Sequence, residues 1–387
     1  MRTKTPALLL GAAALLAVTA CTDNAPATTP GDARALSVTA TDTTCQVSAA
    51  TAPSGTLSFS VTNSGTTVNE FYVLASDGLR IVAEVENIGP GLTRDLVLSV
   101  PPGDYFSACK PGMVGDGIRA AFSVSDSGVP VGPTGDEAAL VAAANTAYGS
   151  YVRDQVEQLL TGTQAFVEAY TAGDDDLARA LYAPTRVHWE RIETVAESFG
   201  DLDPKMDLRE ADLEEGEEWT GWHLLEKDLW PARARDYTPL TKTERATYAK
   251  DLLDNTQTLY DRTRDLTYTA DGIANGAKGL LDEVATGKVT GEEEYWSRTD
   301  LWDFQANVDG ARVAWQGLHD LLVRKDAALD ASIETRFAEL QKLLDAQKKG
   351  DGFVLYDELG TDEVKALSDA VNALSEPLSK MAAAVLK

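Results

Sequence analysis

Histidine and cysteine are scarce in this chain, with three of each among 387 residues. The histidines, His188, His223 and His319, all lie after residue 180. An electron-transfer copper site needs two imidazoles and a thiolate, so the first 180 residues cannot build one. The sequence also lacks His-Glu-x-x-His, His-x-x-Glu-His and Gly-x-Ser-x-Gly. These absences argue against a zinc peptidase and a serine hydrolase.

Positive charge is also in short supply, with 34 Lys and Arg against 61 Asp and Glu and a formal net charge of −27. Such a protein repels nucleic acid and anionic lipid, so neither is an expected ligand. The charge suits a cationic ligand, although an acidic surface also simply keeps a protein soluble. The length and the 44% hydrophobic content allow two domains with sizeable cores.

The N-terminus has the features of an export signal. Arg2 and Lys4 precede an apolar run that ends in small residues before Cys21. The run is too short to span a bilayer comfortably and is typical of a cleaved secretory signal. Because the cysteine position resembles a bacterial lipobox, we expect residues 1–20 to be removed and Cys21 to be lipidated. The protein would then be anchored to the cell membrane outside the cytoplasm, at the cell surface or in the periplasm. An ordinary signal peptide with a chance cysteine is the alternative.

The other two cysteines, Cys45 and Cys109, form an even pair. In an oxidising compartment a disulfide between two such cysteines is the default expectation. A soft-metal site built from two thiolates is the alternative interpretation.

The spacing of apolar residues divides the chain into two parts. Short alternating stretches separated by turn signals favour a β-sandwich at residues 36–126, after a flexible tether at 21–35. Glycine and proline mark a linker at 127–136. From there on helical stripes prevail, such as the one running from Val156 to Tyr170. Residues 137–387 are therefore predicted to form an all-α domain of helical bundles.

Two passages of the helical part place candidate metal ligands three residues apart. Glu190 and Glu193 form one pair, and His223 and Glu226 form the other. Residues at i and i+3 share a helix face, so each pair could present two ligands to one cation. His223 follows Trp222 and precedes two leucines, which indicates partial burial. A single His-x-x-Glu pair also occurs as a solvated or hydrogen-bonded couple, so the spacing leaves both interpretations open.

Three longer strings resemble the imelysin (M75 peptidase-like) family: residues 188–193, 199–205 and 221–230. The preceding β-rich part is similar to a cupredoxin, so the resemblance covers nearly all of the mature chain. It implies a cupredoxin-like β-sandwich followed by two four-helix bundles, with a metal site in the cleft between the bundles.

The resemblance also implies a function, which is to capture iron outside the cytoplasm and deliver it to a membrane permease. By motif position the implied ligands are Glu190, Glu193, Asp207, His223, Glu226 and, as a further candidate, Glu283. Glu70 of the β-rich part is a subsidiary candidate. Carboxylates with one imidazole suit ferric or ferrous iron, and would also accept zinc, manganese or copper in vitro.

The partners that the resemblance implies are an iron permease of the EfeU type and a haem peroxidase of the EfeB type. The membrane would be a further contact, through the lipid anchor. A binding protein is expected rather than an enzyme, because Lys227 follows Glu226 where a metallopeptidase helix would carry a second histidine. The alternatives are a metal-dependent peptidase-like protein and a surface protein associated with carbohydrate or haem.

Overall fold

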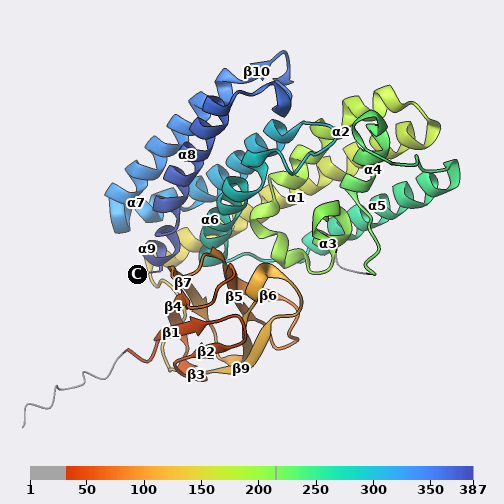
Figure 1. The fold of residues 1–387 in the computed structure, drawn as a ribbon. Helices are drawn as coiled ribbons and strands as arrows, with labels where there is room; N and C mark the ends of the chain where they lie inside the picture. Colours follow the sequence, from red (N-terminus) through yellow and green to blue (C-terminus); the bar gives the residue numbers. More distant parts are fainter. Residues whose placement is uncertain (1–31, 214–215, 387) are drawn as a thin grey trace, which may run out of the picture. The chain divides into compact units, whose positions relative to one another are not determined.

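The computed structural model describes residues 32–213 and 216–386. The expected signal peptide, Cys21 and most of the tether lie outside the described residues. Strands occupy the chain from Ala35 to Ser125, and helices dominate from Asp136 to Val385. This order confirms the predicted fold class (Figure 1). In the described part of the chain, none of the helices combines the length and the apolar character needed to cross a membrane.

The N-terminal domain is a sandwich of two sheets. One sheet has the order β2 (Cys45–Val47), β1 (Ala35–Ala40), β4 (Gly55–Asn63), β7 (Thr93–Val100). The other has the order β3 (Thr51–Pro53), β9 (Ile118–Ser125), β8 (Gly103–Cys109), β5 (Asn69–Leu74), β6 (Ile81–Ile88). Alternate residues of β4 are buried, as expected for a strand with one face on a core. Phe59 of β4 meets Phe71 and Phe122 of the opposite sheet at ring-centroid distances of 5.2 and 5.7 Å.

A disulfide joins the two sheets. It links Cys45 of β2 to Cys109 of β8, and their Cα atoms are 5.5 Å apart. Because both sulfur atoms are in the bridge, neither is a thiolate that could hold a soft metal in this state.

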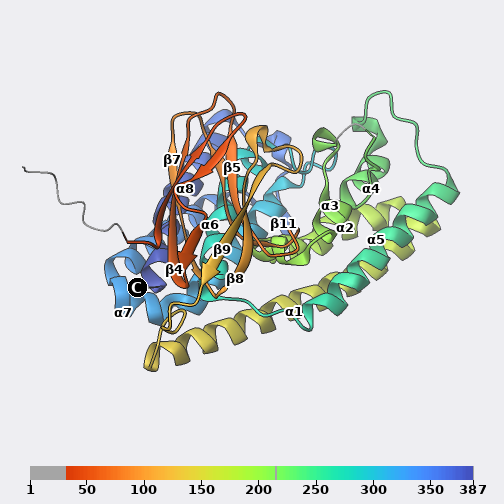
Figure 2. The same ribbon diagram turned by 90° about the horizontal axis from the view of Figure 1, so that it is seen from below.

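The helical domain consists of two groups of helices (Figures 1 and 2). The first group comprises α1 (Asp136–Ala172), α2 (Asp175–Glu190), α3 (Leu202–Asp207), α4 (Trp222–Leu229) and α5 (Lys242–Thr263). The second comprises α6 (Ala270–Thr286), α7 (Asp300–Ala346), α8 (Thr361–Leu378) and α9 (Met381–Val385), with a small hairpin of β10 (Lys348–Lys349) and β11 (Gly352–Phe353) between α7 and α8.

Helix α7 is in fact two antiparallel arms. Asp326 has non-helical φ and ψ angles of −154° and 80°, and its carboxylate caps the second arm by accepting from the Leu329 amide. Gln305 of the first arm hydrogen-bonds to Gln341 of the second. The second group therefore contains four long helical segments, which agrees with the bundle arrangement expected from the sequence.

The β-sandwich contacts the start of α6 through polar groups. Asp271 accepts a hydrogen bond of 2.8 Å from the backbone amide of Ser99 in β7. Asn275, one turn later, donates to the carbonyl of Val97 at 2.9 Å. Strand β7 is at the edge of its sheet, and these bonds use backbone groups that are not needed for pairing with β4. They tie α6 to the sandwich.

Candidate metal centre

Helix α4 carries the His-x-x-Glu pair and is almost completely buried. Seven of its eight residues are buried, including His223 and Glu226. The preceding Gly221 has φ +87°, and a Cβ atom there would lie 2.2 Å from the carbonyl oxygen of Met206. Only glycine permits this approach. The contact brings α4 against the end of α3, where Asp207 follows Met206.

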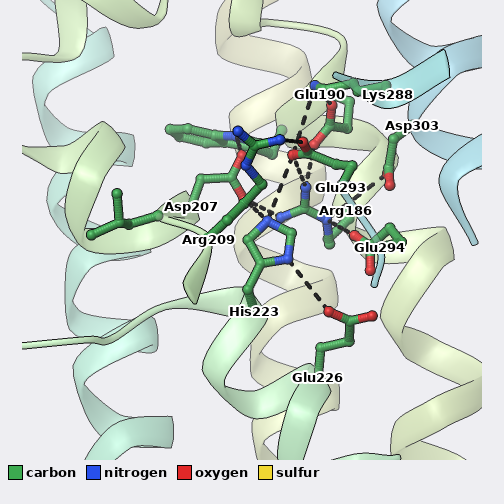
Figure 3. A network of polar contacts seen from close by, with 12 residues as sticks. Arg186, Glu190, Asp207, Arg209, His223, Glu226, Lys288, Glu293, Glu294 and Asp303 are labelled. Carbon is green, nitrogen blue, oxygen red and sulfur yellow. Dashed lines mark hydrogen bonds and ion pairs between the residues drawn. The ribbon is translucent and has the colours of Figure 1, made fainter. Parts of the chain in front are cut away.

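The imidazole of His223 lies among carboxylates (Figure 3). Its Nε2 atom is 3.5 Å from Asp207 and 3.6 Å from Glu293, and its Nδ1 atom is 3.5 Å from Glu226. The side chain is 1% exposed, and neither ring nitrogen has a hydrogen-bond partner in the described part of the chain. A buried histidine without hydrogen bonds is costly unless a ligand binds a ring nitrogen or nearby carboxylates stabilise the protonated ring.

Glu226 is held by the backbone of a loop from the second helical group. Its Oε1 atom accepts hydrogen bonds from the amides of Trp296 and Ser297, at 2.8 and 2.5 Å. Its Oε2 atom has no hydrogen-bond partner among the described residues and faces His223. The carboxylate is therefore fixed in position before any ion arrives.

Arg186, on α2, is a fully buried cation at the middle of this cluster. Its guanidinium contacts Glu190 at 2.5 Å and Glu294 at 2.6 Å, and it also pairs with Asp207. Glu293 lies 3.5 Å away. Arg186 thus gathers carboxylates from three segments and offsets their repulsion.

Lys288, also buried, holds the two glutamates that the sequence placed in one pair. Its Nζ atom is 2.6 Å from Glu190 and 2.6 Å from Glu193. Asn307 of α7 donates to both carboxylates. The expectation that these glutamates share one helix face is wrong, because α2 ends at Glu190 and a short 3-10 helix (Glu193–Phe199) begins at Glu193. The chain turns between them, and Lys288 is the group on which they meet.

Four acids of the cluster were not foreseen as ligands: Glu293, which is 7% exposed, and Glu294, Asp300 and Asp303, which are at most 1% exposed. Both carboxylate oxygens of Asp303 lack hydrogen-bond partners in the part of the chain that the structure describes, and Arg186 is 3.9 Å away. Burial raises the pKa of Asp300 to about 7 and, with the charge of Glu226, that of Glu294 to about 8.

The two carboxyl groups near the Nε2 atom of His223, those of Glu293 and Asp207, have lowered rather than raised pKa values. Burial alone would raise both pKa values. The positive charge of Lys288 lowers that of Glu293, and the charge of Arg186 lowers that of Asp207. His223 lowers both, so the two pKa values lie below the ordinary range. Burial and Arg186 lower the pKa of His223, yet the neighbouring carboxylates outweigh them and raise it to about 10. Without metal, His223 is a cation at neutral pH.

Two groups of three side chains bring their ligand atoms within 4.8 Å of one another in residues 32–213 and 216–386. They are Asp207, His223 and Glu293, and His223, Glu226 and Glu294. Of the ligands expected from the sequence, the structure thus brings Asp207, His223 and Glu226 together. Glu190 and Glu193 lie beside this centre, on Lys288.

Glu283 occupies a different position. It lines a cavity of about 320 Å³ together with Glu193, Asp207, Lys288 and Glu293, so it faces the approach to the cluster rather than His223. Glu86 and Met113 of the β-sandwich line the same cavity. A cation entering here would pass several carboxylates before it reached the buried groups.

Glu70, the subsidiary candidate, is buried in β5. Its carboxylate accepts a hydrogen bond from the hydroxyl of Tyr72, and burial raises its pKa. It belongs to neither group of candidate ligands.

Comparison with known proteins gives matches over both domains. Residues 144–381 match the imelysin family, and residues 9–121 match the cupredoxin-like domain family. The chain is 38% identical over 373 residues to the iron uptake system component EfeO of Yersinia pseudotuberculosis, which covers 95% of each chain. It is 34% identical over 369 residues to the protein of the same name from Escherichia coli, again over 95% of each.

A solved structure shares the fold. The crystal structure of an iron-regulated protein A precursor from Parabacteroides distasonis aligns with a TM-score of 0.51 and 18% identity, covering 68% of this chain and 98% of that one. With helical bundles and both family matches in place, the chain belongs to the imelysin family, carries a cupredoxin-like domain before the helical one, and is similar along 95% of its length to iron uptake components named EfeO.

Proposed function

We propose that this protein takes part in iron uptake by capturing iron at the His223 cluster outside the cytoplasm and handing it to a membrane permease. The observation that carries the proposal is the buried imidazole of His223, which makes no hydrogen bond to the described residues and has carboxylates from three segments within 3.6 Å of its nitrogens. The iron uptake components to which the chain is similar along 95% of its length support the same function.

The donor set suits iron as cargo. Carboxylate oxygens and one imidazole are ligands that ferric and ferrous iron accept, and zinc or manganese would also bind such a set in vitro. The buried cations Arg186 and Lys288 stabilise the acids when no ion is bound, so the empty protein keeps its fold and can bind again. A carrier needs this property because it must release its cargo.

We propose binding rather than hydrolysis. Where a metallopeptidase helix would supply a second imidazole, this chain has Lys227. The ammonium of Lys227 lies over the rings of Trp219, Tyr237 and Trp296 at 5.2–5.5 Å, so it packs in an aromatic cluster instead of joining the centre. A metal-dependent peptidase would have to work with one imidazole.

The proposed location is the outer side of the cytoplasmic membrane, with Cys21 as the lipid attachment site. Replacing Cys21 with Ser should release the protein from membranes or leave it unprocessed. Unchanged fractionation and unchanged mass would contradict lipidation. An EfeU-type permease and an EfeB-type haem peroxidase are the proposed partners, and co-purification from detergent-solubilised membranes would test both.

Titration of the purified protein with ferrous iron without oxygen, and with chelated ferric iron, tests the function. His223→Ala should weaken binding by about tenfold or more, since loss of a ligand costs at least as much as loss of an outer partner. His319→Ala is the matched control, because His319 is 44% exposed and bonds to Asp330 in α7. Equal affinities for the wild type and the His223 variant would refute the assignment.

A further inference from the structure

The imidazole of His223 separates the surrounding acids into two groups. Asp207 and Glu293 face its Nε2 atom, whereas Glu226 faces Nδ1 and Glu294 lies on that same side. Figure 3 shows His223 between these sets. One ion bonds only one of the two nitrogens, so the position of the ion determines which acids are ligands.

Access favours the Nε2 side. Asp207 and Glu293 line the cavity of about 320 Å³, whose wall also includes Arg209 and Asp212 with 29% and 45% of their side chains exposed. Glu226 and Glu294 are 0% exposed and do not line that cavity. The two acids on the Nε2 side therefore border the cavity, whereas the two acids on the Nδ1 side are enclosed in the packed interior.

The acids also differ in how firmly they are held. The Oε1 atom of Glu226 accepts two backbone hydrogen bonds, and Glu294 is engaged by Arg186 at 2.6 Å and by the Ser297 hydroxyl at 2.9 Å. Asp207 is bonded by Arg186 and by the Trp189 indole. Glu293, in contrast, has no charged partner closer than 3.5 Å among residues 32–213 and 216–386, and its four cationic neighbours lie at 3.5–4.0 Å. Among these four carboxylates, Glu293 thus has the longest contacts and can turn towards an ion at the lowest cost.

We propose that the captured ion binds Nε2 of His223 with Glu293 and Asp207 as carboxylate ligands, and that Glu226 is a positioning residue. The Oε2 atom of Glu226 accepts a hydrogen bond from the Nδ1–H group of His223. This bond holds the ring proton on Nδ1, so Nε2 keeps its lone pair for the metal. Imidazole ligands commonly donate their second N–H to a carboxylate in this way, which fixes the ring and its tautomer. The inference rests on the proposed function and assigns the glutamate of the His-x-x-Glu pair a role outside the set of ligands.

Nitrogen-15 NMR of histidine-labelled full-length protein loaded with Zn²⁺, a diamagnetic probe, tests the assignment directly. The variants His188→Asn and His319→Asn identify the resonances of His223. We expect zinc on Nε2 and a proton on Nδ1. Zinc on Nδ1 would overturn the inference while leaving the proposed function intact. A wild-type protein that binds neither zinc nor iron would overturn both.

Two adjacent residues supply a matched pair of variants. Glu293→Gln should weaken Zn²⁺ and ferrous iron binding at least tenfold more than Glu294→Gln, because Glu293 lies on the Nε2 side and Glu294 on the other. The reverse order would overturn the inference.

Glu226→Gln keeps an oxygen for the Trp296 and Ser297 amides but turns an N–H group towards Nδ1. The Nδ1 atom must then accept a hydrogen bond, so the ring proton moves to Nε2 and blocks the ion. We expect affinity to fall about 10–100-fold and the proton resonance to move from Nδ1 to Nε2. An affinity loss without this change of tautomer would mean that Glu226 is an ordinary ligand, and would overturn the positioning role.

Discussion

Lys288→Met should destabilise the metal-free protein strongly. The ammonium is 3% exposed and lies 2.6 Å from both Glu190 and Glu193. Removing one partner of a buried ion pair costs about 3–5 kcal/mol. The lower end applies here, because Asn307 still donates to both carboxylates at 2.8–3.0 Å. Burial, together with the charge of Glu190, also raises the pKa of Glu193, so that acid takes up a proton when the lysine is lost.

A loss of about 3 kcal/mol corresponds to about 6 °C in the melting temperature of a domain of this size. Denaturant unfolding of the metal-free protein, followed by tryptophan fluorescence, measures this loss in the free energy of unfolding. Lys205→Met is the control, since Lys205 is 51% exposed in its pair with Asp201 and such pairs contribute below about 1 kcal/mol. Equal stability of the two variants would refute the view that Lys288 holds the empty cluster together.

Three other local features, His223, Gly221 and the disulfide, lead to further predictions. His223 has a pKa of about 10, so binding must release its proton, and iron affinity should fall about tenfold per pH unit from pH 8 to 6; a flat profile would contradict this. The same raised pKa stabilises the empty protein below pH 6.5, and that stabilisation is lost as the pH rises through 10. Gly221→Ala should clash with the Met206 carbonyl, lowering both melting temperature and iron affinity. Thiol labelling of the unreduced, denatured protein should find Cys45 and Cys109 blocked, and replacing both with Ala should cost about 4 kcal/mol because the bridge closes a 64-residue separation.

Local patterns were enough to predict the fold class. The alternation in strands such as β4 and the helical stripe of α1 each depend on neighbours in sequence, and both appear in the structure. The Gly-x-His-x-x-Glu segment could likewise be singled out, since its spacing lies within one helix.

The rest of the centre depends on contacts between distant segments. Glu293 and Glu294 lie in a loop after Gly291 that has no periodic pattern, and only the fold brings them to His223. Asp300 and Asp303 stand in the first turn of α7, where acids usually compensate the helix dipole, so their sequence position gives no sign of burial. Glu190 and Glu193 do not share a helix face despite their i,i+3 spacing, because α2 ends at Glu190 and the next helical turn begins at Glu193.

The most direct measurement of the central claim is anomalous X-ray diffraction at the iron edge from crystals of the protein soaked with ferrous iron. The account predicts a strong peak within coordination distance of His223, on the side of Asp207 and Glu293. A peak at Glu70, or no peak near His223 at full iron loading, would contradict it.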